Sequence, residues 1–510
     1  MAKEVLIDGN HLTLADLVAV SHERAKVGLA PAARKQVERA RAVIDEILAS
    51  GRIVYGVNTG FGKLADVQIK PDHVNELQLN LIRSHAAGVG PPFPVPVTRA
   101  IMLLRANVLA KGFSGVRLEV VERLLDLLNH EIHPQIPSKG SVGASGDLAP
   151  LAHLALVLIG EGSAMVADHV IEGGRALAEK RITPIVLQAK EGLALINGTQ
   201  AMTGAGALAW SDAVRLARAA DVVAAMSIEA MRGTDTAFDD RIVNARPHQG
   251  AVAVARNLRD LIHDSKIRES HRDCHKVQDH YSLRCTPQVH GTARDALTYA
   301  EQVLSTEINA ATDNPLVFSN DHVLLSGGNF HGAPVSVALD SLAIAVAQLA
   351  SISERRTALL TDSSESELPP FLTQDSGLHS GFMLAQVTAA ALVSENKVLA
   401  HPASVDTIPT SANKEDHVSM GVTAAMKFAQ IVENTRQVLA IEWLCAAQAL
   451  DLLAPLKTSA ALQKAHRALR ASVPMLQSDR VLANDIATAA ALLIAPKTFS
   501  DLESSLGHPL

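Results

Sequence analysis

The feature that most constrains the fold is a set of long, alanine-rich stretches that follow residue 200. They contain few of the β-branched alternations that are typical of strands, and they exceed the mean globular helix length of about 11–12 residues. Long antiparallel helices of this kind pack as bundles. The chain is therefore predicted to be mainly α, with a long-helix central bundle and C-terminal region over residues 201–510. The predicted helices cover residues 201–231, 291–311, 332–361, 379–400 and 416–453.

The first 200 residues follow a different pattern, because glycine and proline divide them into short segments. Such residues mark loops. Between the loops lie helical patterns, and residues 116–130 carry apolar side chains at the i, i+3, i+4 and i+7 positions of a helix. We predict a mixed α+β N-terminal domain over residues 1–200, ahead of the helical domain. The loop segments are GVNTGFG at 56–62, GVGPPFPVP at 88–96 and HPQIPSKGSVGASG at 133–146.

One of these loops carries the tripeptide Ala144-Ser145-Gly146, which can react with itself. The amide nitrogen of Gly146 can attack the carbonyl carbon of Ala144, because neither side chain is large enough to block the approach. Loss of one water closes a five-membered ring, and loss of the Ser145 hydroxyl as a second water leaves an exocyclic methylene. The product is 4-methylideneimidazol-5-one, an electrophile that no ordinary side chain provides.

Taken alone, the tripeptide is also compatible with a plain turn or with a serine nucleophile. A nucleophile elbow has the pattern G-x-S-x-G, but here Gly146 follows Ser145 directly. A serine hydrolase that uses Ser145 with His153 therefore remains only a remote alternative. A phosphate-binding loop is excluded, because no lysine follows the glycines as that motif requires.

Further polar loops lie between apolar segments, and together they contain the groups that elimination of an amine requires. These groups are a base, a clamp for a carboxylate and side chains that hold a ring. A helical scaffold without chemistry would leave these loops without a role. The candidate residues are Tyr55 in YGVNTGFG, His85 in SHAAG, Asn197 in NGTQ, Gln278, Tyr281 and Arg284 in QDHYSLR, Phe330 in SGGNFHG, and Glu415 in TSANKED.

Composition argues against partners other than a small molecule. The net charge is −7, whereas a nucleic-acid-binding surface is basic. The apolar stretch at 331–352 is interrupted by Asp340, and a membrane span needs about 20 consecutive apolar residues. We therefore expect no nucleic acid, no membrane span and a buried helix at 331–352.

The cysteine count and the N-terminal sequence favour a cytoplasmic protein. The chain has 3 cysteines, Cys274, Cys285 and Cys445, and a sparse, odd number is not typical of a disulfide framework. The N-terminus, MAKEVLIDGNHL, lacks the charged and apolar regions of a secretory signal.

A metal site is not expected either. The run HRDCHKVQDH, residues 271–280, places His271, Cys274, His275 and His280 at irregular spacing. Zinc sites use paired ligands at regular spacing.

Several runs, taken in order, resemble the aromatic amino-acid ammonia-lyases and aminomutases over roughly residues 50–500. The resemblance implies a mainly helical homotetramer in which loops from different subunits line each active site. It also implies that Ala144, Ser145 and Gly146 form the methylideneimidazolone autocatalytically, without a metal or an external cofactor. The runs are YGVNTGFG, SHAAGVG, GSVGASGDLAPLAH, NGTQA, QDHYSLRCTPQV, TDNPLVF, GGNFHG, LPPF and SANKEDHVSMG.

The resemblance also implies roles for the candidate residues. The substrate amine adds to the exocyclic methylene, and Tyr55 removes the β-proton. Because the pKa of an ordinary tyrosine is about 10, we expect the site to lower the pKa of Tyr55. The implied binding roles are a carboxylate clamp for Arg284, orientation of the carboxylate and the prosthetic carbonyl for Asn197 and Tyr281, pocket shape for Gln278 and Phe330, and ring binding for His85 and Glu415.

Within the family, His85 and Glu415 favour histidine as the substrate, with trans-urocanate and ammonia as products. A carboxylate suits a ring that carries N–H donors, whereas beside a phenyl ring it would be a buried, unpaired charge. The run NFHGAPV resembles the tyrosine and phenylalanine branches equally well. A phenylalanine or tyrosine ammonia-lyase, or a 2,3-aminomutase, therefore remains an alternative.

Overall fold

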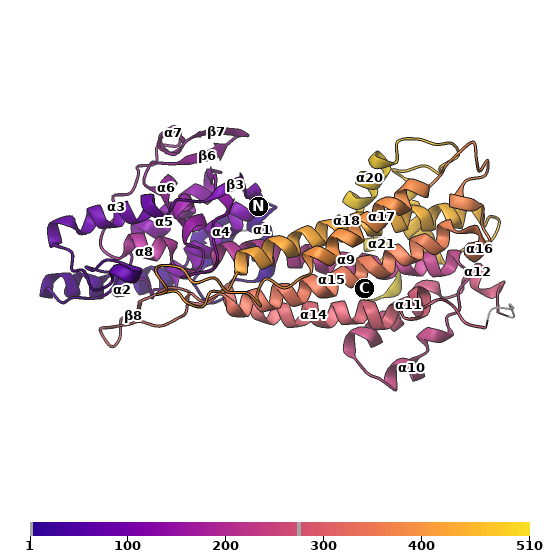
Figure 1. The fold of residues 1–510 in the computed structure, drawn as a ribbon, viewed down its shortest axis with the longest axis horizontal. Helices are drawn as coiled ribbons and strands as arrows, with labels where there is room; N and C mark the ends of the chain where they lie inside the picture. The colour runs from indigo at the N-terminus through magenta and orange to yellow at the C-terminus, as the bar shows by residue number, and fades with distance from the viewer. Residues whose placement is uncertain (1–3, 273–276) are drawn as a thin grey trace. The chain divides into compact units, whose positions relative to one another are not determined.

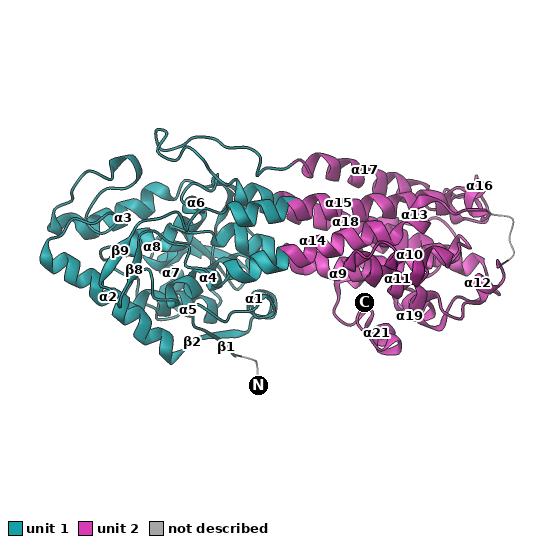
Figure 2. Cartoon of the chain, turned by 90° about the horizontal axis from the view of Figure 1, so that it is seen from below, with its two compact units in different colours: residues 1–208, 300–340, 402–426 teal, residues 209–299, 341–401, 427–510 magenta. Residues whose placement is uncertain are grey.

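The computed structural model describes residues 4–272 and 277–510, which form two compact units (Figure 2). The division differs from the one expected at residue 200, because two later segments join the N-terminal residues in unit 1. Four of its five boundaries fall inside long helices, so no break in composition marks them, and the fifth follows the end of the helix at Met383–Leu399. Unit 1 comprises residues 1–208, 300–340 and 402–426, and unit 2 comprises residues 209–299, 341–401 and 427–510.

Unit 1 holds all the strands of the described residues, in four small sheets (Figure 1). Seven of the nine strands lie before residue 200, as expected for a mixed α+β N-terminal region, and the other two, at residues 316–325, lie in the part predicted to be mainly helical. The pairs are β1 (Glu4–Ile7) parallel to β2 (Lys26–Leu29), β3 (Val89–Pro92) antiparallel to β5 (Pro137–Lys139), β6 (Ser163–Val166) between β4 (His133–Pro134) and β7 (His169–Glu172), and β8 (Leu316–Phe318) antiparallel to β9 (Val323–Leu325).

Three helices of unit 1, α3, α6 and α8, contribute residues to the wall of the cavity described below. Helices α3, α6 and α8 contact one another. The helix predicted over residues 116–130 is confirmed as α5, and its buried residues follow the predicted spacing. The helices are α1 (Leu14–Ser21), α2 (Pro31–Ser50), α3 (Val74–His85), α4 (Val95–Ala110), α5 (Leu118–Asn129), α6 (Leu148–Leu158), α7 (Gly173–Glu179) and α8 (Glu191–Ile196).

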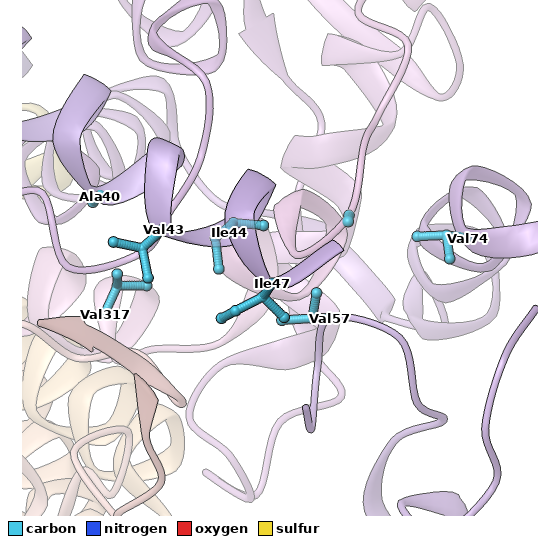
Figure 3. Close-up of a cluster of buried hydrophobic side chains, with 8 residues drawn as sticks. Ala40, Val43, Ile44, Ile47, Val57, Val74 and Val317 are labelled. Carbon is cyan, nitrogen blue, oxygen red and sulfur yellow. The ribbon is translucent and has the colours of Figure 1, made fainter. Parts of the chain in front are cut away.

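A buried cluster fixes the loop that carries Tyr55 (Figure 3). Its centre is one face of α2, formed by Val43, Ile44 and Ile47. Val57 of the Tyr55 loop and Val317 of β8 pack on this face. Burial of such a side chain contributes about 1.5–3 kcal/mol, so the loop is held by its own apolar residue.

Unit 2 is helical throughout its described part. The predicted long helices are confirmed, with shifts of a few residues at their ends. The helices that cross the unit boundary are α9 (Gln200–Ala230), α14 (Thr286–Glu307), α15 (Ala333–Thr361) and α18 (Gly421–Leu452). The others are α10 (Asp240–Asn244), α11 (Gln249–Ile262), α12 (Lys266–Glu269), α13 (Tyr281–Arg284), α16 (Ser363–Ser366), α17 (Met383–Leu399), α19 (Ala460–Arg470), α20 (Leu482–Ile494) and α21 (Ser500–Leu506).

Buried polar contacts join the long helices within unit 2. Arg356 of α15 donates to both carboxylate oxygens of Glu442 of α18, at 2.5 and 3.0 Å, and Ser227 of α9 donates to the same carboxylate at 2.7 Å. The indole nitrogen of Trp210 donates to the carbonyl oxygen of Leu297 at 3.0 Å, which links α9 to α14.

Among the described residues, only α15 is long and apolar enough to cross a membrane by length and composition. Of its most apolar window, 67% is buried inside the protein, as expected for a core helix.

Candidate active site

The Ala144-Ser145-Gly146 loop forms a tight, left-handed turn that only glycine fits at its end. Ser145 has a φ of 51° and Gly146 a φ of 82°, and the Gly146 N–H donates to the carbonyl oxygen of Gly143 at 3.3 Å. A Cβ added to Gly146 would lie 2.2 Å from the carbonyl oxygen of Gly198. Positive φ at a serine is unfavourable and is found at functional sites. The loop thus has the small residues and the strained turn that backbone cyclisation needs.

Asp147 anchors this loop to the start of α9. Its backbone N–H donates to the carbonyl oxygen of Gly198 at 2.7 Å. Its carboxylate accepts hydrogen bonds from the N–H groups of Ala201 and Met202 at 2.8 and 2.9 Å, so it satisfies orphan donors in the first turn of that helix. Burial raises the pKa of Asp147 to about 7, although these hydrogen bonds oppose the shift.

Ser145 lies at a cavity of about 760 Å³, lined entirely by residues of unit 1. The cavity brings together many of the residues singled out from the sequence, although they come from separate segments of the chain. Ala144 and Gly146 flank Ser145 in the loop. The singled-out residues that line the cavity are Tyr55, His85, Ser145, Asn197, Phe330 and Glu415.

Glu415 is directed at Ser145 by its own loop. The Ser145 hydroxyl donates to Glu415 Oε1 at 3.1 Å, while Oε2 accepts from the hydroxyls of Thr410 and Ser411 at 2.8 Å each. The intervening Ser411, Ala412 and Asn413 all have positive φ, between 49° and 64°. Loss of the Ser145 hydroxyl would remove the donor at Oε1 and leave that oxygen free for a ligand.

His85 presents a hydrogen-bond acceptor at this cavity. It is the last residue of α3, and its Nδ1 lies 2.9 Å from the carbonyl oxygen of Leu81. A carbonyl only accepts, so this contact favours the tautomer with the hydrogen on Nδ1 and the acceptor at Nε2. The Ser84 hydroxyl also lies 3.1 Å from Nδ1, and it donates to Nδ1 in the other tautomer. Burial lowers the pKa of His85, and this favours the neutral form, although the Leu81 contact and the Glu415 charge oppose the shift.

The pKa of Tyr55 is raised above its ordinary value, so the prediction that the site lowers it is wrong for this chain. Burial is the largest cause, and the negative charges of Glu415 and Asp313 raise the pKa further. The phenol oxygen accepts one long hydrogen bond, 3.5 Å from the N–H of Gly62, which opposes the shift. Among the described residues, no cation contributes to the shift in the pKa of Tyr55.

Asn197 caps the C-terminal end of α8, and both hydrogens of its side-chain amide are donated within the chain. Nδ2 donates to Asp313 Oδ1 at 3.1 Å and to the carbonyl oxygen of Asn314 at 3.0 Å. The reverse amide orientation would set Oδ1 against these two acceptors. Both amide hydrogens are therefore used within the chain, whereas the resemblance implies that Asn197 orients the substrate carboxylate and the prosthetic carbonyl.

Gln278, Tyr281 and Arg284 belong to unit 2 and are not among the residues that line this cavity. Arg284 donates to Gln278 Oε1 at 3.1 Å and to the carbonyl oxygen of Asp279 at 3.0 Å, and its guanidinium carbon lies 4.6 Å from the centre of the Tyr281 ring. Tyr281 is 71% exposed. Within the described part of the chain, no carboxylate forms an ion pair with Arg284.

One wall of the cavity was not anticipated from the sequence. It is a face of α3 formed by Leu77, Asn80, Leu81 and Ser84, which lie at helical spacing just before His85. The helical spacing of these residues is the feature of the sequence that could have indicated this wall. Lys63 and Lys414 also line the cavity, and exposed lysines carry no comparable signal in a sequence.

The remote hydrolase alternative has no support from geometry. The Ser145 hydroxyl bonds to a carboxylate, and His153 Nε2 accepts instead from the N–H of Gly88 at 3.1 Å.

In residues 4–272 and 277–510, no group of three or more histidine, cysteine, aspartate or glutamate residues could hold a metal ion. Cys274 and His275 of the irregular histidine and cysteine run lie outside the described residues.

Known proteins resemble this chain over nearly its whole length. A family model for aromatic amino acid lyases matches residues 12–471. Histidine ammonia-lyase of Koribacter versatilis is 56% identical over 508 residues, which cover 97% of this chain and 98% of that protein. Histidine ammonia-lyase of an Anaeromyxobacter species is 55% identical, with 96% of this chain and 98% of that protein covered.

Solved structures agree in fold. The crystal structure of histidine ammonia-lyase from Trypanosoma cruzi is 45% identical, with a TM-score of 0.92 and coverage of 98% of this chain and 95% of that one. Tyrosine aminomutase from Streptomyces globisporus is 39% identical, with a TM-score of 0.93 and coverage of 99% of both chains. The chain belongs to the aromatic amino acid lyase family.

Proposed function

We propose that the protein is a histidine ammonia-lyase, which converts L-histidine to trans-urocanate and ammonia as the first step of histidine degradation. The observation that carries the proposal is the pairing of His85 and Glu415 at the cavity that contains Ser145. The names of the similar proteins, histidine ammonia-lyases at 50–56% identity, support the same substrate.

The ring of the substrate is recognised by acceptors. His85 Nε2 and Glu415 Oε1 accept hydrogen bonds. A protonated imidazole ring carries two N–H donors, one for each acceptor, and a neutral ring carries one. A phenyl ring has no donor, so it would leave these acceptors unpaired, at a cost of about 1–3 kcal/mol for each buried group. A phenol has one donor, so tyrosine is the second candidate substrate, and the similarity to a tyrosine aminomutase favours it over phenylalanine.

The prosthetic group is a 4-methylideneimidazol-5-one formed from Ala144, Ser145 and Gly146, without a metal or another cofactor. Its exocyclic carbon supplies an electrophile that binds the substrate amine. The left-handed turn at Ser145 and the absence of room for a side chain at Gly146 support this assignment.

Tyr55 acts as the general base that takes the β-proton. Because burial and Glu415 raise its pKa, the phenolate forms only at alkaline pH unless a cation is brought close to the Tyr55 hydroxyl. Arg284, which has no carboxylate partner in the described part of this chain, suits both that role and the binding of a substrate carboxylate.

The active enzyme is a homotetramer whose sites are shared between subunits. In this assembly Gln278, Tyr281 and Arg284 of a second copy complete the cavity. The exposure of Tyr281 supports this, as do Leu384 and Val387, two exposed apolar side chains one turn apart on α17. Contiguous exposed apolar side chains mark interaction sites. We place the enzyme in the cytoplasm, which the free thiols of Cys285 and Cys445 support.

The substrate is tested with purified full-length protein and a panel of histidine, tyrosine and phenylalanine. Urocanate is conjugated and histidine is not, so its ultraviolet absorbance reports the reaction directly. Urocanate formed faster than coumarate or cinnamate supports the proposal. Faster coumarate or cinnamate overturns the substrate, and a β-amino acid product identifies an aminomutase.

The shared site is tested by mixing two inactive variants. Ser145→Ala removes the electrophile and Arg284→Ala removes the clamp. Coexpressed subunits that share sites produce some sites with both residues intact, so activity should return in the mixed oligomers. If each site is built from one chain, the mixture stays as inactive as its components.

A further inference from the structure

A group of buried charges lies behind the cavity wall and is not used in the reaction proposed above. Lys190 Nζ donates to Asp313 Oδ2 at 2.9 Å, and both side chains are fully buried. Arg105 of α4 is also fully buried. None of the three lines the cavity. Buried ion pairs stabilise a fold no better than apolar packing does, so their presence suggests a role in geometry.

All three charged groups converge on Asn197. Asp313 Oδ1 accepts from Asn197 Nδ2 at 3.1 Å, so the carboxylate that Lys190 neutralises also orients the Asn197 amide. Arg105 donates to the main-chain carbonyl oxygen of Asn197 at 3.0 Å. The side chain and the backbone of this residue are therefore both held by buried charges.

Gly198, the residue after Asn197, contacts Gly146, the glycine that would form the ring. Gly198 forms a parallel bridge with Gly146, and its carbonyl oxygen accepts the Asp147 N–H at 2.7 Å. The same carbonyl leaves no room for a side chain on Gly146. Any movement of Asn197 and Gly198 would therefore change the conformation of the turn at Ser145 and Gly146.

We infer that Lys190, Asp313 and Arg105 are positioning residues for the maturation of the loop, because they hold the Asn197–Gly198 segment against Gly146. This inference rests on the proposed prosthetic group. In the first step the Gly146 nitrogen bonds to the Ala144 carbonyl carbon, and the Ala144 oxygen leaves as water with the amide hydrogens of Ser145 and Gly146. In the second step the Ser145 hydroxyl leaves as water with the Ser145 Cα hydrogen.

The inference is tested by the intact mass of purified full-length variants, which counts the waters lost without reference to activity. Asp313→Asn keeps an acceptor for Asn197 but leaves Lys190 unpaired. We expect most chains of this variant to keep the full mass, whereas wild-type chains lack two waters. The matched control is Glu442→Gln, which disrupts the equally buried Arg356–Glu442 pair of unit 2 and should leave the mass deficit of the wild type.

Asp313→Asn chains that lose two waters as completely as the control would overturn the inference. If this variant yields no soluble protein, Lys190→Met combined with Asp313→Asn decides, because it removes both charges of the Lys190–Asp313 pair. Incomplete dehydration in the double variant supports the inference and full dehydration overturns it. Wild-type protein without any mass deficit would instead refute the prosthetic group itself, so the two failures are distinguishable.

Discussion

Ser145 and Glu415, which are 270 residues apart in the chain, are joined by a hydrogen bond of 3.1 Å from the serine hydroxyl to Oε1 of the carboxylate. The bond connects the loop that can form an electrophile to the loop that can bind a ring. Dehydration of Ser145 removes the donor, so the maturation of one loop frees the binding atom of the other.

Replacement of Gly146 by alanine is expected to block dehydration. The added Cβ would lie 2.2 Å from the Gly198 carbonyl oxygen, and the residue has a φ of 82°. Intact mass should show no loss of two waters, and activity should be absent. The matched control is Gly51→Ala at the end of α2, which has a φ of 67° but no atom within 4 Å of the added Cβ. Dehydration in the Gly146 variant would contradict the proposed cyclisation.

Glu415→Gln is expected to reduce kcat/KM for histidine by about 10- to 100-fold. A hydrogen bond to a charged group contributes about 1.5–3 kcal/mol, and about 1.4 kcal/mol corresponds to a factor of ten. The loss should be smaller for tyrosine, so the selectivity measured by competing substrates should shift. Glu38→Gln, on the exposed face of α2, should change neither. Equal losses for both substrates would show that Glu415 does not bind the ring.

Tyr55→Phe is expected to abolish turnover while dehydration of Ser145 remains complete. The pKa of Tyr55 is raised by burial and by the charge of Glu415, so removal of that charge should lower it. In Glu415→Gln, the rise of kcat with pH should therefore begin at lower pH than in the wild type. A pH–rate profile checks both statements, and wild-type rates in Tyr55→Phe would exclude this base.

Binding of the substrate histidine is expected to weaken as the pH falls below the ordinary pKa of a histidine side chain. The pKa of His85 is lowered by burial, so its ring is neutral at neutral pH and Nε2 accepts a hydrogen bond. Protonation turns that acceptor into a donor. For the same reason the neutral ring favours the folded state, and stability is lost as pH falls from the unfolded pKa, about 6.5, through the lower folded value. His85→Gln, measured by KM against pH between 5 and 8, should flatten the dependence.

Ionisation of the Asp147 carboxyl group is expected to destabilise the fold as the pH rises. Its pKa is about 7 in the folded protein, above the ordinary value of 3.8, so the folded state binds the proton more tightly. Its stabilising contribution is complete below the unfolded value and is lost as pH rises towards 7. Asp147→Asn keeps an acceptor for the first turn of α9, so the difference in Tm between this variant and the wild type should change over that pH range. A constant difference would refute the raised pKa.

Much of the fold follows from local pattern. The long helices α9, α14, α15, α17 and α18 lie close to their predicted ranges, because apolar content and the scarcity of breakers act within each segment. The division into units could not be predicted in the same way. Segments 300–340 and 402–426 join unit 1, and no local signal shows which part of a chain a helix end will pack against.

Residue types in recognisable runs were enough to predict the reaction class and six of the residues that line the cavity. How those six residues are presented to a ligand depends on the folded chain. Burial and the nearby Glu415 raise the pKa of Tyr55, the Leu81 carbonyl lies against Nδ1 of His85, and Asp313 accepts a hydrogen bond from the Asn197 amide. Each outcome depends on electrostatics and hydrogen bonding between side chains and their surroundings, and for Tyr55 and Asn197 the partners lie far apart in the chain.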